Sequence, residues 1–270
     1  MSNLIFHEYR IPIPGVSRKV IHHFSDVPLC LADEQSPLEE RNFSDEKTTG
    51  WLSLRLDFAK QFGELRSAPV AATTYFEELM QAAAEGDALV VAGDIFDYVN
   101  DAALRTYAAR FADLALPHVY VRGNHEPASD IADDSAMAQI KRPVQILDLG
   151  DVIIAGFDDA NRAITAEQLQ ALRDLLAQPK PLIIAMHIPI QVQENELHRL
   201  CDDYFRLNHA SAPKENLEFI DLICQNTDKI AAVLTGHLHF LNTFEIAPGL
   251  TQYVSSQGIL GNINRYIVGE

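Results

Sequence analysis

Residues 88–97, ALVVAGDIFD, form a run of small and β-branched apolar residues that stops abruptly at Gly93 and Asp94. Runs of this length between turn residues are typical of strands that are buried on both faces of a sheet. Further segments repeat the pattern of an apolar run followed by polar residues. They are 19–26, 118–126, 152–159, 181–189 and 229–239. The sequence therefore predicts a buried sheet whose strands end in polar side chains.

Segments with helical spacing of apolar residues lie between the predicted strands. In TTYFEELMQAAAEG (73–86) the large apolar residues recur every three or four positions, and Gly86 marks the end. Thr165 and Gln168 resemble a capping box at the start of another helix. The predicted helices are 73–86, 103–114, 165–178 and 217–226. Alternating strands and helices indicate an α/β layered fold, in which ligands bind at the carboxyl ends of the strands.

Two polar segments, 27–72 and 190–216, interrupt this alternation. Because a loop of that length without secondary structure is unusual in a compact domain, each segment is expected to contain helix. We interpret both as insertions over the active-site face of a single domain that spans residues 1–270. The final segment, 242–270, carries the strand and turn pattern of a hairpin.

The excess of acidic residues argues against nucleic acid as a partner. The chain has 38 Asp and Glu residues against 21 Lys and Arg residues, which gives a formal net charge of −17. Because binding to a nucleic-acid backbone depends on Lys and Arg, bulk nucleic-acid binding is not expected. A single basic side chain could still hold a substrate phosphate, and the candidates are Arg162, Arg199 and Arg206.

The cysteines and the N-terminus favour a cytoplasmic protein. Cys30, Cys201 and Cys224 are an odd number without CxxC spacing, so neither a disulfide framework nor a zinc finger is expected. The first residues, MSNLIFHEYR, lack the pattern of a signal peptide. No run reaches the roughly 18 apolar residues of a membrane helix, so no membrane association is expected.

Residue types that bind metals stand at the ends of the predicted strands. Asp94 and Asp97 follow one strand within GDIFD, and Asn124 and His125 follow the next within GNHE. The other candidates at strand ends are Asp26, His187, His237 and His239. GHLH is the strongest single motif, because two residues separated by one position project on the same side of an extended chain. Each of the other motifs, taken alone, is more often an ordinary turn or a half-buried histidine.

The series of motifs carries more weight than any one of them. Imidazole, carboxylate and amide ligands at successive strand ends can surround two divalent ions. Such a pair of ions orients a phosphate group and lowers the pKa of a bound water. With GDxxD, GNHE, a lone histidine and GHxH all present in order, the sequence predicts a two-metal phosphoesterase site.

GDIFD, GNHE, MH and GHLH resemble, in kind and in order, the motifs of the calcineurin-like metallophosphoesterases, and the resemblance runs from about residue 19 to the end. It implies a four-layer α/β/β/α sandwich, here with helical insertions over the active-site face, and a dinuclear metal centre bridged by Asp94. The remaining ligands would divide between the two ions, one ion taking Asn124, His187 and His237 and the other taking Asp26 and His239.

The resemblance also implies catalytic roles. His125 is similar to the family's acid catalyst, and Asp97 would hold that imidazole in one orientation and tautomer. A hydroxide that bridges the metals would attack phosphorus in line. Manganese is the expected metal, with iron, zinc, nickel and magnesium as alternatives.

The first motif departs from the family pattern of Asp-x-His, because Pro28 stands two positions after Asp26. Proline has no side-chain donor or lone pair, so one ion loses an imidazole ligand. His22 lies about 13 Å back along an extended strand, too far to replace it. A water could fill the place, as could a residue of the 27–72 segment, the candidates being Asp33, Glu34 and Asp57.

These observations predict a metal-dependent phosphoric ester hydrolase that acts on a small phosphodiester or phosphomonoester. The missing histidine leaves three outcomes open, namely a weaker ion, a changed metal preference, or lost catalysis. The alternative function is therefore a non-catalytic or weakly active phosphoesterase-fold scaffold that binds a protein partner.

Overall fold

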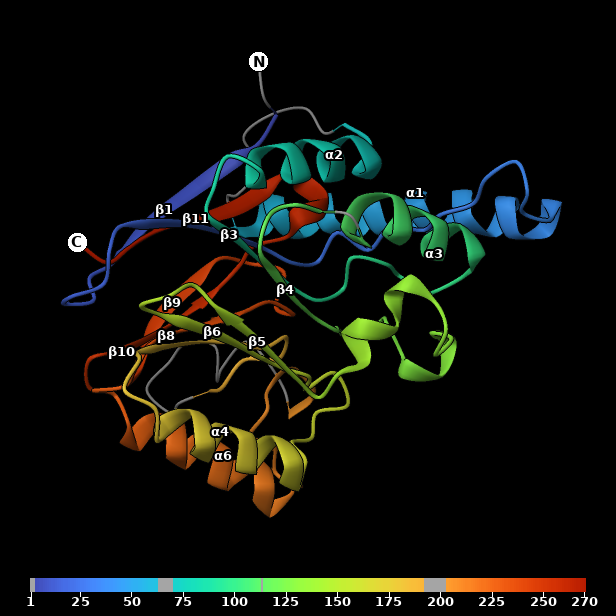
Figure 1. The fold of residues 1–270 in the computed structure, drawn as a ribbon. Helices are drawn as coiled ribbons and strands as arrows, with labels where there is room; N and C mark the ends of the chain where they lie inside the picture. Colours follow the sequence, from blue (N-terminus) through green and yellow to red (C-terminus); the bar gives the residue numbers. More distant parts are fainter. Residues whose placement is uncertain (1–2, 63–69, 113, 192–202) are drawn as a thin grey trace.

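The computed structural model describes residues 3–62, 70–112, 114–191 and 203–270, whose strands form two sheets (Figure 1). In spatial order, the five-stranded sheet consists of β1 (Ile5–Ile11), β11 (Asn262–Val268), β2 (Lys19–Phe24), β3 (Ala88–Ala92) and β4 (His118–Val121). The six-stranded sheet consists of β5 (Val144–Asp148), β6 (Ile153–Phe157), β7 (Leu182–Ala185), β8 (Ile230–Thr235), β10 (Leu250–Val254) and β9 (Asn242–Ala247).

Helices cover the outer side of each sheet (Figure 1). Those beside the five-stranded sheet are α1 (Leu38–Phe62), α2 (Ala72–Ala83) and α3 (Asp101–Tyr107), which a π-helical turn continues over Ala108–Ala112. Those beside the six-stranded sheet are α4 (Ala166–Leu176) and α6 (Lys214–Gln225). Short 3-10 helices occupy Ala128–Asp130, Ala136–Lys141, Asp203–Phe205 and Gly258–Leu260.

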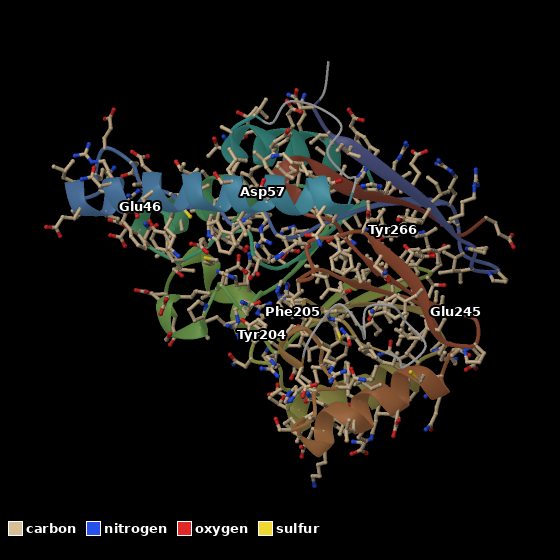
Figure 2. The ribbon with its side chains drawn as sticks, turned by 180° about the vertical axis from the view of Figure 1, so that it is seen from behind. Glu46, Asp57, Tyr204, Phe205, Glu245 and Tyr266 are labelled. Atoms are coloured by element: carbon tan, nitrogen blue, oxygen red, sulfur yellow. The ribbon has the colours of Figure 1, made fainter. Side chains whose placement is uncertain are left out.

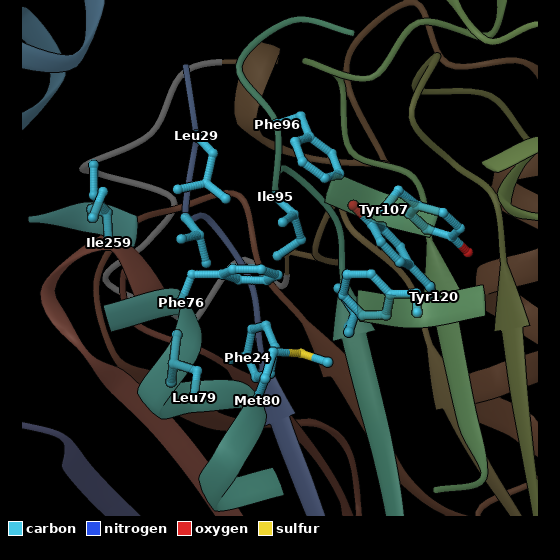
Figure 3. Close-up of a cluster of buried hydrophobic side chains, with 14 of the residues drawn as sticks. Phe24, Leu29, Phe76, Leu79, Met80, Ile95, Phe96, Tyr107, Tyr120 and Ile259 are labelled. Atoms are coloured by element: carbon cyan, nitrogen blue, oxygen red, sulfur yellow. The ribbon is translucent and has the colours of Figure 1, made fainter. Parts of the chain in front are cut away.

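Three apolar clusters hold these layers together, and β3 shows why strand alternation produces them. Leu89 and Val91 belong to the cluster beneath α2. Phe76 and Leu79 of that helix belong to the same cluster (Figure 3). Ala88, Val90 and Ala92 of the same strand point into the second cluster, between the sheets. A third cluster joins the six-stranded sheet to α4 and α6. The predicted α/β class is confirmed, and the packing is consistent with the predicted four-layer order.

The predicted site residues follow strands that run in the same direction. β2, β3 and β4 pair in parallel in one sheet, and β6, β7 and β8 pair in parallel in the other. The carboxyl ends of parallel strands meet at one edge of a sheet. The two sheets therefore present the turns after β2, β3, β4, β7 and β8 side by side.

Two strands were missed by the sequence analysis, namely β1 and β5. Both are edge strands of half-exposed residues, and Phe6 of β1 is 42% exposed. Their side chains alternate between core and solvent, so neither contains the continuous apolar run that revealed the central strands. The C-terminal hairpin is confirmed by the antiparallel pairing of β9 with β10.

The predicted helix in the 27–72 segment is confirmed by α1. In the 190–216 segment, residues 192–202 lie outside the described residues, and the described remainder contains a 3-10 helix and the start of α6. Cys30 and Cys224 carry free thiols, and Cys201 is outside the described residues. Among the described helices, none is long and apolar enough to cross a bilayer.

Candidate metal centre

The turns after five strands bring the predicted ligands into one buried cluster. Asp26 follows β2, Asp94 follows β3 and Asn124 follows β4, while the histidines His187, His237 and His239 follow β7 and β8. Four of these six residues adopt a positive φ, namely Asp26 at 57°, Asp94 at 56°, His237 at 71° and His239 at 61°. Non-glycine residues in this conformation are uncommon, and they concentrate at functional sites. The backbone therefore turns sharply at the points where a side chain must reach the cluster.

Close approach of the turns depends on glycines that precede the ligands. A Cβ added to Gly93 would lie 2.5 Å from the backbone nitrogen of Gly123 in the neighbouring turn. A Cβ on Gly236 would lie 2.8 Å from the Asp26 carboxylate. Both separations are shorter than real contacts of a Cβ, so glycine is required for the turns to meet.

One group of ligand atoms surrounds Nε2 of His187. This nitrogen lies 3.3 Å from Asp94 Oδ2, 3.1 Å from Asn124 Oδ1 and 3.1 Å from His237 Nδ1. The other ring nitrogen, Nδ1, is 2.7 Å from the carbonyl oxygen of Ala92 and donates to it. That hydrogen bond fixes the ring so that Nε2 faces the cluster.

The second group lies beside it and shares Asp94. Asp26 Oδ1 is 2.9 Å from His239 Nε2. The other Asp26 oxygen accepts hydrogen bonds from the backbone N–H of His237 at 3.0 Å and from the hydroxyl of Ser25. Asp26, Asp94 and His239 each offer one ligand atom within 4.8 Å of the others, as do Asp94, His187 and His237.

The ligand atoms have the spacing and chemistry of a metal site. An ion about 2.1 Å from each ligand holds neighbouring ligands about 3.0 Å apart in octahedral geometry and about 3.4 Å apart in tetrahedral geometry. The separations of 2.9 to 3.3 Å around His187 and His239 agree with these values. Among the described residues, His237 Nε2 is buried without a hydrogen-bond partner. The residues therefore fit two adjacent divalent ions, each held by carboxylate, imidazole or amide ligands.

The electrostatics of the cluster also favour cations. Burial alone would lower the pKa of His187, but the negative charges of Asp94, Asp26 and Asp159 raise it to about 10. A proton on His187 thus balances part of the negative charge in the absence of an ion. Because metal ligands must lose their protons, an ion would displace it.

His125 lies at the rim of the cluster and is paired with Asp97. His125 Nδ1 is 2.8 Å from Asp97 Oδ1, and its backbone N–H donates to Asp94 Oδ1 at 2.9 Å. Burial by itself would lower the pKa of His125, but the contact with Asp97 and the charge of Asp94 raise it above its ordinary value. The side chain is 27% exposed, and its imidazole lines the cavity described below.

Glu126 and Asp159 accept hydrogen bonds from the backbone of the turns that carry the ligands. Neither was predicted from the sequence as a site residue. Glu126 is fully buried and accepts hydrogen bonds from three backbone N–H groups of the turns that carry Asp94 and Asn124. Asp159 accepts the backbone N–H of His187 and of Ile188, each at 2.9 Å. Both stand at predicted strand ends, Glu126 within GNHE and Asp159 at the end of the 152–159 segment, and that position was the available signal.

Helix α1 brings cationic and aromatic side chains to the site. The Arg55 guanidinium lies within hydrogen-bond distance of both ring nitrogens of His239, of which only the unprotonated one can accept, and it lies 4.5 Å from the ring of Trp51. Trp51 also contacts His125 edge-on, with 5.5 Å between the ring centroids. Lys47 lies 3.3 Å from Asp97. Sequence reasoning singled out none of the three.

The acidic candidates for the missing histidine have other surroundings. Asp33 pairs with Arg105, and Glu34 is exposed. Asp57 pairs with Lys60 on the outer side of α1, where its side chain is 78% exposed (Figure 2). The expectation of a replacing carboxylate is therefore not met by these residues, and α1 instead places Arg55 beside His239.

A cavity of about 450 Å³ opens above the ligand cluster. Asp94, Asn124, His125, His237 and His239 form its polar floor. Its apolar walls come from α1 on one side and from the segment that carries Tyr204 and Phe205 on the other (Figure 2). The wall residues are Trp51, Leu54, Tyr204, Phe205, Leu238 and Phe240.

Of the candidate phosphate-binding arginines, Arg162 and Arg206 both contact Asp203. Arg162 donates to the carbonyl of Asp203 and lies 5.3 Å from the Tyr204 ring, and Arg206 pairs with Asp203. Neither is among the residues that line the cavity. Arg199 lies outside the described residues.

Comparison with known proteins gives one family match and several structural likenesses. A family model described as calcineurin-like phosphoesterase matches residues 23–241. A dimetal phosphatase from Danio rerio has a similar structure, with a TM-score of 0.56 and 10% identity over 89% of this chain and 88% of that chain. The calcineurin-like phosphoesterase YfkN from Bacillus subtilis gives a TM-score of 0.45 and 14% identity over 90% and 82% of the two chains. No curated protein sequence matches.

Proposed function

The chain belongs to the calcineurin-like phosphoesterases and is thus a metal-dependent phosphoric ester hydrolase, and we propose on this premise that its substrates are small phosphate esters with a flat or apolar organic part. The observation that carries the proposal is the cavity of about 450 Å³, which joins a metal-binding floor to aromatic walls. A space of this size accommodates one small molecule. The net charge of −17 disfavours a nucleic-acid substrate.

The ligand cluster determines where the phosphate would lie. Divalent ions held there would stabilise the charge that develops on the phosphate oxygens and lower the pKa of a water. The carboxylate and amide oxygens suit manganese, the imidazoles also suit iron, zinc and nickel, and manganese is the first metal to test. The phosphate then faces the floor of the cavity, and its organic group extends toward Trp51, Tyr204 and Phe205.

His125 is proposed as the acid that protonates the leaving oxygen. Asp97 engages Nδ1 at 2.8 Å, so the second ring nitrogen is the one available to the substrate. The contact with Asp97 and the charge of Asp94 outweigh burial and raise the pKa of His125 above its ordinary value, which favours the protonated form that an acid catalyst needs. Asp97 itself is held ionised, because its pairing with His125 and the charge of Lys47 outweigh the effect of burial and lower its pKa.

The organisation of the chain is consistent with a single domain of residues 1–270 that carries α1 as an insertion over the site. Trp51, Leu54 and Arg55 of that helix line the cavity, which supports this proposal. The free thiols of Cys30 and Cys224 support a reducing, cytoplasmic location.

Metal-dependent turnover of chromogenic esters tests the proposal. The protein is treated with chelator, reloaded with Mn²⁺ and assayed with p-nitrophenyl phosphate and bis-p-nitrophenyl phosphate. We expect turnover only after reloading, with the diester hydrolysed at least as well as the monoester. His125→Ala should reduce turnover by about 100-fold or more while metal is retained.

His118→Ala is the matched control, because its ring bonds to the carbonyl of Leu116 and does not line the cavity. Its turnover should stay within about twofold of the unmodified protein. Absence of turnover with every divalent ion tested would contradict the proposal and favour a non-catalytic scaffold.

A further inference from the structure

We propose that Arg55 supplies the resting positive charge on the Asp26–His239 side of the centre, so that one divalent ion binds tightly and the second binds only weakly. The inference rests on the metal centre of the proposed function. It concerns the three-ligand group of Asp26, Asp94 and His239, and it assigns a role to a residue of α1 that the family motifs do not include.

The two ligand groups differ in completeness. His187 lies within 3.3 Å of ligand atoms from Asp94, Asn124 and His237, so four side chains converge on one position. The other group has three ligands among the described residues. Two positions after Asp26, where the family pattern has a histidine that would be the fourth ligand of this group, the chain carries Pro28.

The backbone around Pro28 accommodates proline without loss. The N–H groups of Val27 and Leu29 donate to the carbonyls of Asp94 and Ile95 at 2.9 and 2.7 Å. Residue 28 lies between two donors that pair with the neighbouring strand end. Proline has no N–H group, and at residue 28 it leaves the pairing of both neighbouring donors intact. The segment after Asp26 is therefore held in place by hydrogen bonds and not by a ligand at residue 28.

Arg55 lies against the ligand that this side retains. Its guanidinium nitrogens reach Nδ1 of His239 and, at 3.1 Å, Nε2 of the same ring. A neutral imidazole has a lone pair on only one nitrogen. Whichever nitrogen of His239 carries it, an N–H group of Arg55 lies within hydrogen-bond distance of that lone pair. An ion beside Asp26 must displace this contact to use His239 as a ligand.

The position of Arg55 is built into the fold. The residue is 4% exposed, its guanidinium lies 4.5 Å from the Trp51 ring, and its backbone carbonyl accepts a hydrogen bond from Gln257 at 3.5 Å. A buried charge of this kind needs negative partners. The carboxylates of Asp26, Asp94 and Asp97 provide them.

A guanidinium and a divalent ion compete for the same carboxylates. With Arg55 in place, the negative charge of Asp26 is already compensated, and a cation that enters beside it is repelled by the guanidinium at short range. Of the four ligands around His187, Asp94 is also a charge partner of Arg55, whereas the direct contact of Arg55 is with His239 of the other group. A substrate phosphate would then face one tightly held ion and one guanidinium.

Titration of the metal-free protein with Mn²⁺ tests this inference. Calorimetry on the unmodified chain should give one tight site and a second site at least about 30-fold weaker. Arg55→Met keeps an apolar side chain against Trp51 and removes the charge, so the second site should tighten by about tenfold or more. Arg55→Gln should give the same direction of change and serves as the second variant if Arg55→Met folds poorly.

Arg265→Met is the matched control, because Arg265 pairs with Glu8 at the surface, and it should leave both sites unchanged. Electron paramagnetic resonance provides the second measurement. With two equivalents of Mn²⁺ the unmodified chain should show the six-line signal of isolated ions, and Arg55→Met should show the coupled signal of an ion pair.

Two tight sites in the unmodified chain would overturn the role of Arg55 and leave the proposed function intact. A second site whose affinity changes by less than twofold in both variants would overturn it as well. If no divalent ion bound to either protein, both the inference and the proposed function would fail.

Discussion

Replacing Glu126 tests whether the turns of the metal centre are held by one buried carboxylate. Oε1 accepts the N–H groups of Ile95 and Phe96 at 2.9 and 3.1 Å and the hydroxyl of Tyr120 at 2.5 Å. Oε2 accepts the N–H of Gly123 at 3.0 Å. In Glu126→Ala, three buried backbone donors and one hydroxyl lose their acceptor.

The size of the effect follows from these hydrogen bonds. A buried donor without a partner costs about 1–3 kcal/mol, so the three backbone groups alone give a loss of at least about 3 kcal/mol. In a protein of this size that loss lowers Tm by about 6–12 °C. Glu126→Gln can keep the acceptor at Oε1 but turns an amide N–H toward Gly123. Its loss should therefore be smaller, about 1–3 kcal/mol.

Urea unfolding of the metal-free proteins, followed by circular dichroism, measures these losses without a contribution from bound ions. The matched control is Glu77→Ala, because Glu77 is a half-exposed carboxylate paired with Arg110 at 2.9 Å. Its removal should change stability by less than about 1 kcal/mol. If Glu126→Ala lost no more stability than Glu77→Ala, the turns would not depend on this carboxylate and the reasoning would be refuted.

Three further predictions concern catalysis, pH and metal. Asp97→Asn removes the charge that orients His125, so kcat with Mn²⁺ should fall about 10- to 100-fold at unchanged metal content, whereas the exposed Asp134→Asn should leave it unchanged. Burial lowers the pKa of His23 to about 3, whereas an unfolded histidine titrates near 6.5. The unfolded chain therefore takes up the proton first, and stability decreases as the pH falls below about 6.5. In urea unfolding, His23 should account for about 1.4 kcal/mol of the stability that is lost between pH 7.5 and pH 5.5. This part of the loss should be absent in His23→Gln. An equal loss of stability in both proteins would contradict the prediction. Addition of Mn²⁺ at about 100 times its Kd should stabilise the fold by about 2.7 kcal/mol in thermal unfolding, and Asp94→Asn, which removes a ligand common to both groups, should abolish most of this increase.

The central strands and their polar ends were predictable because two simple patterns coincide. Continuous apolar runs such as ALVVA mark strands that are buried on both faces, and parallel strands place their carboxyl ends together. Asp94 and Asn124 could therefore be placed near each other from these patterns, whereas His187 follows a strand of the other sheet and was grouped with them by the series of motifs. β1 and β5 were missed because edge strands alternate between core and solvent and lack such runs.

The contribution of α1 could not be predicted from the sequence. Trp51 and Arg55 are one helical turn apart, and nothing in WLSLR distinguishes them from the aromatic and basic residues of an ordinary amphipathic helix. Only the position of the helix over the cavity reveals that they face His125 and His239. The sequence favours the acidic residues of the same segment because carboxylates bind metals, but Asp33 and Asp57 pair with basic neighbours instead.

Anomalous X-ray scattering from crystals soaked in Mn²⁺ is the measurement that tests the central claim most directly, because it locates bound ions independently of turnover. The strongest peak should lie among the ligand atoms of Asp94, Asn124, His187 and His237, and any second peak should lie between Asp26 and His239 at lower occupancy. No peak within coordination distance of Asp94 would contradict the assignment of the strand-end cluster as a metal centre.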